Sequence, residues 1–354
     1  MAYPLKGRGA VSSPPARYER HHGEAIDDGW YTEPAPDSVA TSVQPEPART
    51  VISRNDSPDI GFSQSINPYR GCEHGCVYCY ARPTHAWLGL SPGLDFETRL
   101  FFKARAAERL RHELGKPGYV PRLIMLGANT DPYQPVEKRL KVTRSILEVL
   151  QNCRHPVSIV TKGALIERDL DILSSMARER LVSVMVSLTT LDPDLKRRLE
   201  PRTASPLARL GAIRRLADAG VPVGTLVAPV IPALTDHELE RLLEAAARSG
   251  ARCAGYVVLR LPLEVRDLFR DWLLAHFPDR ARHVMARVHS MRDGRDNDPR
   301  FGSRMTGSGV DAALLKQRFE VAARRLGLES RMGFTLDTTR FRPPRDSDLQ
   351  IPLL

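Results

Sequence analysis

The sequence predicts an α/β fold: an open partial (β/α)6 barrel with a disordered N-terminal tail and a helical C-terminal extension. Six short β-rich apolar runs alternate with helical patterns at a spacing of roughly 25–40 residues, which is typical of parallel strands joined by right-handed crossovers. Most of these runs are apolar on both faces, as strands of a buried parallel sheet are. Because six strands are fewer than the eight of a closed barrel, we expect the barrel to stay open.

The composition is that of a soluble globular protein. Of the 354 residues, 42% are hydrophobic and 27% are charged, and no apolar run reaches the roughly 18 residues that a membrane helix needs. The N-terminal residues are not followed by an apolar stretch, so no secretory signal is expected. We therefore expect a cytoplasmic protein with no membrane partner.

The chain divides into three predicted parts. Residues 1–56 are rich in proline and polar residues and show no periodic apolar face, which predicts a disordered tail. Residues 57–262 contain the strand–helix alternation and form the predicted barrel core. Residues 263–354 are mostly helical in pattern and form the predicted extension.

The predicted elements follow in a regular order. The strands are expected at 65–67, 123–126, 157–161, 182–187, 223–227 and 256–259. The helices between them are expected at 101–114, 139–150, 168–178, 206–219 and 236–247, and those of the extension at 265–276, 280–288 and 310–326. Thr235 and Glu238, three residues apart before an apolar stripe, predict a capping box.

The formal net charge of +10 favours an anionic partner such as nucleic acid. Only eight of the 52 basic residues are lysine, and an excess of arginine also arises from a GC-rich coding bias. The basic loop from Arg292 to Arg304 is the best candidate for contacting an anionic partner, and a solvated surface loop is its alternative.

The most informative segment runs from Gly71 to Tyr80. It places Cys72, Cys76 and Cys79 within eight residues, in a chain with five cysteines. An odd number of cysteines, three of them crowded together, indicates metal ligation in a reducing compartment and not a disulfide framework. Because the segment follows the first strand directly, it should lie at the carboxyl edge of the sheet, where functional groups of parallel α/β folds gather.

Thiolates bind either zinc or an iron–sulfur cluster. A structural zinc site needs a fourth ligand, and His74 lies between two of the cysteines in a tight loop, where we expect it to point away. One alternative is thus a zinc-stapled nucleic-acid-binding protein without catalysis. Another is a non-catalytic iron–sulfur electron-transfer protein, which would also need a fourth ligand.

Polar side chains follow the predicted strands at the same edge. Asn129, Thr130 and Asp131 come after the second strand, Lys162 ends the third, and Ser187 ends the fourth. They could bind a cofactor, and Lys162 could pair with a carboxylate or a phosphate. The alternative for each is an ordinary turn, loop or strand end.

Three further residues are candidates for holding a substrate. Arg202 and Arg260 could each clamp a phosphate or a carboxylate, and Tyr133 could lie over the substrate. The alternatives are a helix-capping role for Arg202 and packing of Tyr133 against neighbouring prolines.

The Cys72-x3-Cys76-x2-Cys79 spacing, with aromatic Tyr78 just before the last cysteine, resembles the radical S-adenosylmethionine (AdoMet) superfamily. The resemblance extends from about residue 61 to residue 261, because the strand–helix alternation matches the partial barrel of that family. The segments Asn-Pro-Tyr-Arg-Gly-Cys at 67–72 and Thr-Asp-Pro-Tyr-Gln-Pro-Val-Glu at 130–137 resemble an uncharacterised subgroup related to spore photoproduct lyase.

The resemblance implies that the three cysteines bind a [4Fe–4S] cluster whose unique iron takes the amino and carboxylate groups of AdoMet. An electron from the cluster would then release a 5′-deoxyadenosyl radical. Tyr78 would lie against the adenine and Ser187 would contact the ribose. Asn129, Thr130 or Asp131 would meet the methionine amino group, although the glutamate usual in the family is absent.

The same resemblance implies the partners and the type of reaction. The electron would come from an external one-electron donor of the flavodoxin or ferredoxin type. Likeness to spore photoproduct lyase makes a lyase-like reaction on a nucleobase or a nucleic acid one candidate, while the substrate itself stays unknown.

Overall fold

The predicted strands form neighbouring parallel strands of one sheet in the computed structural model, which describes residues 4–19, 38–330 and 334–345. Within these residues the strand order is β11-β10-β9-β8-β7-β6-β3-β2, with β2 antiparallel to β3 and all other pairs parallel. The bounds are β2 Ile52–Arg54, β3 Gln64–Ile66, β6 Ile124–Leu126, β7 Val157–Thr161, β8 Val182–Leu188, β9 Val223–Val230, β10 Cys253–Val258 and β11 Glu329–Ser330.

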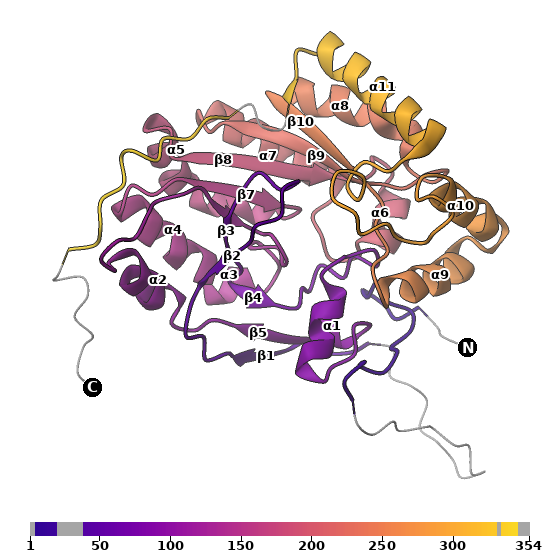
Figure 1. Cartoon of the computed structure of the whole chain (residues 1–354), viewed down its shortest axis with the longest axis horizontal. Coiled ribbons are helices and arrows are strands. Elements are labelled where there is room, and N and C mark those ends of the chain that lie inside the picture. The colour runs from indigo at the N-terminus through magenta and orange to yellow at the C-terminus, as the bar shows by residue number, and fades with distance from the viewer. Residues whose placement is uncertain (1–3, 20–37, 331–333, 346–354) are drawn as a thin grey trace.

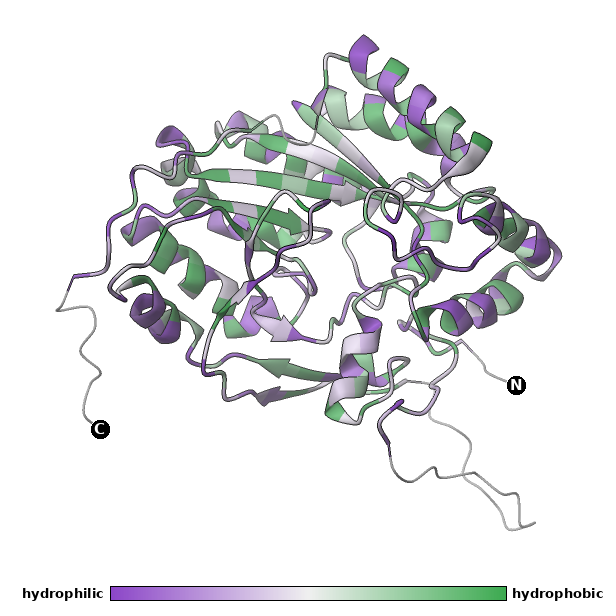
Figure 2. Ribbon diagram, viewed as in Figure 1, coloured by the Kyte–Doolittle hydropathy of each residue, from purple (hydrophilic) through white to green (hydrophobic). Residues whose placement is uncertain are grey.

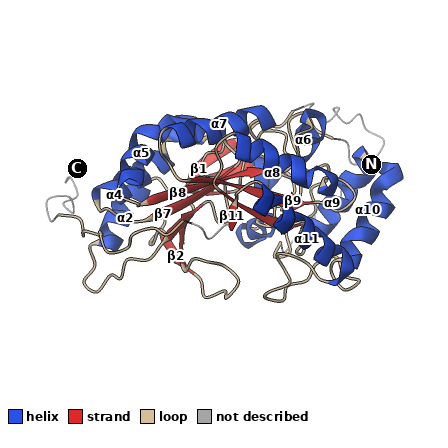
Figure 3. Cartoon of the chain, turned by 90° about the horizontal axis from the view of Figure 1, so that it is seen from above, coloured by secondary structure: helices blue, strands red, loops and turns tan. Residues whose placement is uncertain are grey.

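The helices that connect these strands cover one face of the sheet (Figures 1 and 3). They are α2 Ala106–Leu114, α4 Val142–Asn152, α5 Leu170–Arg178, α7 Pro206–Asp218 and α8 Leu239–Arg248. Two short helices, α3 Glu137–Leu140 and α6 Pro193–Leu199, lie in the connections, and α6 packs with α9 (Val265–His276) in a second apolar cluster. Short 3-10 helices η1 Arg82–Leu88, η2 Ala164–Asp169 and η3 Asp236–Glu238 precede or follow them. The sequential strand order and one-sided helices confirm a parallel α/β fold, and β2 and β11 lie at the two edges of the sheet in the part of the chain described.

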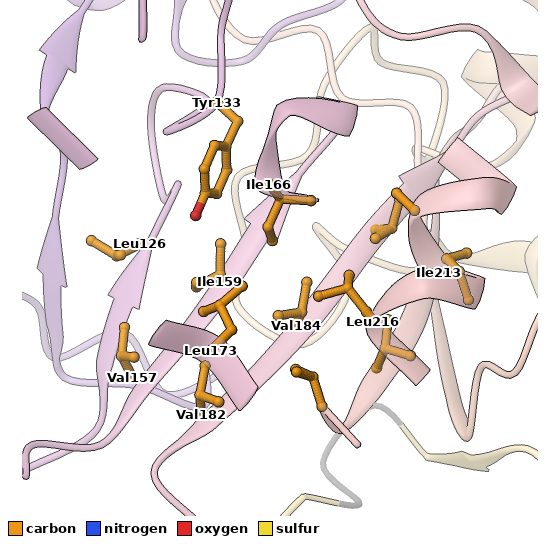
Figure 4. Close-up of a cluster of buried hydrophobic side chains, with 14 of the residues drawn as sticks. Leu126, Tyr133, Val157, Ile159, Ile166, Leu173, Val182, Val184, Ile213 and Leu216 are labelled. Carbon is orange, nitrogen blue, oxygen red and sulfur yellow. The ribbon is translucent and has the colours of Figure 1, made fainter. Parts of the chain in front are cut away.

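The main core lies between the sheet and this helical layer. In Figure 2, hydrophobic residues gather on the strands and on the helices that pack against them. Figure 4 shows Ile159 and Val184 of the strands beside Leu173 and Leu216 of the helices. Side chains such as these are fully buried, and burial of apolar surface supplies the main driving force for this packing.

The prediction of a disordered tail over residues 1–56 is wrong for the described parts of that segment. Strand β1 (Ser42–Pro45) pairs with β5 (Arg99–Phe102), which also pairs with β4 (Tyr69–Arg70), so a second, three-stranded sheet forms from described residues. Strand β2 joins the main sheet. Residues 1–3 and 20–37 lie outside the described residues.

Two local predictions are corrected. The helix expected from residue 101 begins only at Ala106, because β5 occupies the preceding residues. The capping box does not form: the Thr235 hydroxyl accepts a hydrogen bond from the Ile231 amide at 2.9 Å, and Glu238 accepts from Thr190 and from the Leu191 amide. Glu238 thus connects two loops and does not cap its own helix.

The C-terminal extension is helical, with α9 Val265–His276, α10 Pro278–Ser290 and α11 Gly309–Arg325. No helix of the described residues is both long enough and apolar enough to cross a bilayer.

The basic loop of the extension is largely neutralised. The Arg304 guanidinium binds the Asp59 carboxylate through two hydrogen bonds of 2.7 and 2.5 Å, and Arg300 binds Asp293 and Asp298. Arg292 is fully buried and donates to four backbone carbonyls. Arg292 is thus enclosed by the protein, and Arg300 and Arg304 are each paired with carboxylates, which makes the loop a poor candidate for an anionic partner.

A buried histidine makes the stability of the fold depend on pH. His155 precedes β7, is fully buried, and contacts the Tyr119 hydroxyl at 2.8 Å and the Pro156 carbonyl at 3.0 Å. Burial lowers the pKa of His155 from 6.5 to about 4. The unfolded chain therefore binds a proton that the folded chain does not, and stability is lost as the pH falls from 6.5 towards 4.

We expect His155→Gln to remove this dependence. Between pH 7 and pH 5 the free energy of unfolding of the wild type should fall by about 2 kcal/mol more than that of the variant. Urea unfolding at both pH values measures the difference, and equal losses in the two proteins would contradict the assignment.

Candidate functional site

The three clustered cysteines lie on a buried loop at the carboxyl edge of the sheet. The loop follows β3 and β4, as predicted, and Cys72 and Cys76 are buried while Cys79 is partly buried. Cys76 and Tyr78 pack in a second apolar cluster with Phe269 and Trp272 of α9, so the extension supports the loop. Burial raises the pKa of all three thiols.

Two fully buried side chains hold the backbone of this loop. Gln134 accepts from the Glu73 amide at 2.9 Å and donates to the Gly71 carbonyl at 3.3 Å, so it braces the chain on both sides of Cys72. Arg82 donates to the Cys76 carbonyl at 2.9 Å and to the Gly75 carbonyl at 3.3 Å. A loop fixed in this way presents its thiols in a set arrangement, which is what a ligand site requires.

The N-terminal segment is built against the same loop. Glu97 is fully buried, forms an ion pair with Arg82, and accepts hydrogen bonds from the amides of Gly9 at 3.0 Å and Ala10 at 2.9 Å. A Cβ atom on Gly9 would lie 1.7 Å from the Gly75 carbonyl oxygen. Only glycine allows so close an approach of the two backbones.

We expect Gly9→Ala to displace the N-terminal segment from the cysteine loop. The new methyl group would overlap the Gly75 carbonyl, which is part of the backbone and cannot rotate away as a side chain can. We therefore expect the free energy of unfolding of the variant to fall by roughly 1–3 kcal/mol. Limited proteolysis should cut within residues 4–19 faster than in the wild type. Ser13→Ala, an exposed position in the same segment, is the control, and an unchanged cleavage pattern in the glycine variant would contradict the prediction.

Tyr78 belongs to a buried polar network centred on Glu200. The Glu200 carboxylate accepts from the Tyr78 hydroxyl and from Thr189 at 2.6 Å, pairs with Arg209, and lies 3.4 Å from the Lys162 ammonium. Burial acts to raise the pKa of Glu200, but Arg209 and Lys162 hold it well below its usual range. The carboxylate is thus ionised and fixes the Tyr78 ring beside the cysteines.

Lys162 is oriented towards the cysteine loop. Its ammonium lies 2.9 Å from the Ala228 carbonyl and 5.8 Å from the centre of the Tyr78 ring. The end of β7 therefore lies beside Tyr78, as the sequence predicted for the carboxyl edge. Ser187, near the end of β8, is buried, and its carbonyl accepts from Arg209 at 2.9 Å.

Asp131 joins the cysteine loop to the ends of β6 and β7. Its carboxylate accepts from the Lys162 amide and the Thr161 hydroxyl, both at 2.6 Å, and lies 3.3 Å from the His74 ring. Burial opposes ionisation, but His74 and these donors hold the pKa of Asp131 below its usual value. His74 is buried and its Nδ1 atom faces the partly buried Asp131 carboxylate.

The two other residues after β6 behave differently from each other. Thr130 is buried and its hydroxyl donates to the Tyr69 carbonyl at 3.1 Å. Asn129 has an exposed side chain, and its backbone amide donates to the side-chain oxygen of Asn67 at 2.8 Å. Of the three residues proposed for the methionine amino group, Asn129 is therefore the one left exposed to solvent.

The three substrate candidates do not lie together. Tyr133 is buried in the main core, its hydroxyl donating to Asp169 at 3.1 Å (Figure 4), so it presents no surface to a substrate. Arg202 contacts Glu73 at 3.2 Å on the outer side of the cysteine loop. Arg260 follows β10 and lies 5.5 Å over the ring of Tyr80.

Arg260 is the candidate whose charge is least satisfied. Its Nε atom is buried without a hydrogen-bond partner and one of its Nη atoms lies 3.6 Å from the Met305 sulfur. Burial and the neighbouring Arg304 lower the pKa of Arg260. It forms no ion pair with another described residue, so an anion could satisfy it.

The sequence analysis missed Glu200, Arg209, Gln134 and Glu97 as parts of the site. Each is a charged or amide side chain that is fully buried or nearly so, and the contacts that tie Glu200, Glu97 and Gln134 to the site or to the N-terminal segment span 61 to 122 residues of sequence. Among the described residues, no three His, Cys, Asp or Glu side chains are grouped so as to hold a metal ion.

The fold is similar to that of solved structures of spore photoproduct lyase. A mutant with bound AdoMet and dinucleoside spore photoproduct superimposes with a TM-score of 0.57, at 16% sequence identity, over 81% of this chain and 80% of that chain. Spore photoproduct lyase complexed with dinucleoside spore photoproduct gives a TM-score of 0.57 at 17% identity over 81% of each chain. At such low identity these matches show a common fold.

Relatives by sequence are uncharacterised proteins. One from Mycobacterium tuberculosis is 42% identical over 222 residues, which cover 62% of this chain and 65% of that protein. One from Methanocaldococcus jannaschii is 28% identical over 178 residues, covering 50% of this chain and 64% of that protein. The chain thus matches less than two thirds of the length of either relative.

The model of the radical SAM superfamily matches residues 66–246, which include the cysteine loop, Lys162, Ser187 and Glu200. This match covers half of the chain, and it agrees with the cysteine spacing and with the sequential parallel sheet. The chain therefore belongs to the radical SAM superfamily.

Proposed function

We propose that the chain is a radical SAM enzyme that binds a [4Fe–4S] cluster through Cys72, Cys76 and Cys79 and cleaves AdoMet reductively. The observation that carries the proposal is the presence of three thiols, two buried and one partly buried, on a braced loop at the carboxyl edge of a parallel sheet, beside Tyr78 and Lys162. When bound, the cluster supplies one electron to the sulfonium of AdoMet.

The residues present fit such a cluster. Three thiols suit a cube of four irons in which one iron keeps a position for AdoMet. The other two cysteines, Cys153 and Cys253, are buried away from the loop and belong to the amino ends of β7 and β10. Neither is therefore a fourth ligand.

We assign a different set of residues to each part of AdoMet: the adenine, the ribose and the methionine group. Tyr78, held by Glu200, would pack against the adenine, and Ser187 would meet the ribose. Lys162 would bind the carboxylate of the methionine group, and Asn129 would accept from its ammonium. Asp131 and Thr130 would act by positioning the turn after β6, since their oxygens already accept from or donate to protein groups.

The substrate we propose is an anionic molecule, with a nucleobase in nucleic acid as the candidate that the spore photoproduct lyase fold favours. Arg260 would bind its anionic group, because this guanidinium is partly buried and lacks a carboxylate partner among the described residues. The exposed ring of Tyr80 beside it could stack on a base.

Anaerobic reconstitution with iron and sulfide, chemical reduction and addition of AdoMet test the activity. We expect about four irons per chain and formation of 5′-deoxyadenosine. A cluster-replete and reduced sample that forms no 5′-deoxyadenosine would contradict the proposal, and a zinc-containing, iron-free protein would favour the nucleic-acid-binding alternative.

A further inference from the structure

A basic hollow lies directly behind the first cysteine. It has a volume of about 480 Å³ and is lined by Thr41, Val43, Glu73, Pro135, Val136, Lys138, Arg139 and Arg202. These residues come from four distant segments of the chain: the start of the three-stranded sheet, the cysteine loop, the segment around α3, and the turn after α6. We call this surface the basic hollow.

The charges of the basic hollow do not cancel. Lys138, Arg139 and Arg202 supply three cations, and the one carboxylate is that of Glu73, which Arg202 contacts at 3.2 Å. Neither Lys138 nor Arg139 forms an ion pair with any described residue, and both are exposed. An excess of unpaired exposed cations attracts an anionic partner and raises its rate of association.

The basic hollow also shares residues and hydrogen bonds with the cysteine loop. Glu73 is the residue next to Cys72 and lies almost entirely buried in the wall of the hollow. Gln134, which directly precedes the lining segment, binds the backbone on both sides of Cys72 through the Glu73 amide and the Gly71 carbonyl. A partner seated in the hollow would thus touch Glu73, the residue next to Cys72.

We propose that the basic hollow is the docking surface for an acidic electron-carrier protein that reduces the cluster. This inference rests on the proposed function. A protein partner fits better than a small ligand because the cations stand exposed around the hollow, whereas small-molecule sites are mostly apolar and enclose their ligand. Arg260, the candidate for the substrate, is at the end of β10 and does not line the hollow.

With a flavodoxin as the carrier, the electrons and protons of the transfer balance. The anionic flavin hydroquinone gives up one electron and becomes the neutral semiquinone, while the oxidised cluster gains that electron. No proton has to move and no bond to the protein forms.

The test is reduction of the reconstituted full-length protein by photoreduced bacterial flavodoxin, followed by stopped-flow absorbance at low salt. We expect the double variant Lys138→Glu/Arg139→Glu to be reduced at least about tenfold more slowly than the wild type. The difference should shrink at high salt, because screening weakens interactions between exposed charges. Reduction by dithionite, and the 5′-deoxyadenosine that it yields, should be unchanged.

The matched control is Arg282→Glu/Arg324→Glu. Both arginines are exposed, they lie on α10 and α11, and the change in net charge is the same. In Figure 1 these helices lie at the right and upper right, apart from β1 at the bottom and α3 near the middle. Equal slowing in the two double variants would overturn the proposal, because only net charge would then matter.

Two other results would also overturn it. One is a wild-type rate of reduction by flavodoxin in the Lys138→Glu/Arg139→Glu variant. The other is that the same variant loses its binding to a single-stranded DNA oligonucleotide while flavodoxin still reduces it at the wild-type rate. That result would make the hollow a nucleic-acid site. Failure of the proposed function is distinguishable, since then dithionite would yield no 5′-deoxyadenosine even in the wild type.

Discussion

Replacing Cys76 by alanine should abolish the cleavage of AdoMet. The cysteine loop provides three thiols, and the two remaining cysteines are buried elsewhere, so no other thiol can take over the lost position. We expect the iron content to fall from about four to fewer than about two irons per chain. Formation of 5′-deoxyadenosine should fall to the level of a blank without protein.

Cys153→Ala is the matched control for this result. Cys153 is as buried as Cys76 but belongs to the main core, so its replacement should affect stability and leave the iron content and the cleavage of AdoMet intact. Iron analysis and chromatography of the products measure both variants. A Cys76→Ala protein that retained four irons and full activity would show that the loop does not hold the cluster.

The second large effect is expected for Glu200→Ala. The substitution leaves Arg209 buried without its carboxylate and frees the Tyr78 hydroxyl. Removing one partner of a buried ion pair costs about 3–5 kcal/mol, because an uncompensated charge remains. Urea unfolding measures the loss, and the affinity for AdoMet, measured by calorimetry on the reconstituted protein, should fall with it since Tyr78 is no longer fixed.

Glu167→Ala provides the comparison. Glu167 pairs with the half-exposed Arg215, and such pairs contribute about 0–1 kcal/mol. We expect its loss to leave both stability and AdoMet affinity nearly unchanged. Similar stability losses in the two variants would contradict the role given to burial, and an unchanged AdoMet affinity in Glu200→Ala would contradict the positioning role.

The sheet and the cysteine loop could be predicted from the sequence because their patterns are local. Buried parallel strands such as β7 and β8 are mostly apolar runs rich in β-branched residues and interrupted only by serine and threonine, and the three cysteines are close neighbours in the chain. The same reasoning placed Lys162 and Ser187 correctly at the carboxyl ends of their strands.

The rest of the site depends on contacts that composition and periodicity do not reveal. Glu200 meets Tyr78 across 122 residues, and Glu97 meets Gly9 across 88. The N-terminal segment has no apolar period, and its contacts are polar ones to distant residues, among them the backbone hydrogen bonds to the Glu97 carboxylate and the bond from Ser12 to Asp271. Likewise, a tyrosine in the turn after a strand is a reasonable candidate for contacting a substrate. The burial of Tyr133 in the main core follows from how α5 and η2 pack on the strands.

The central claim is that the three cysteines leave one iron of the cluster open to AdoMet. Electron paramagnetic resonance of the reduced, cluster-replete protein tests it most directly, recorded before and after adding AdoMet. We expect the spectrum to change and the change to saturate at about one AdoMet per cluster. A spectrum that AdoMet leaves unaltered would contradict it.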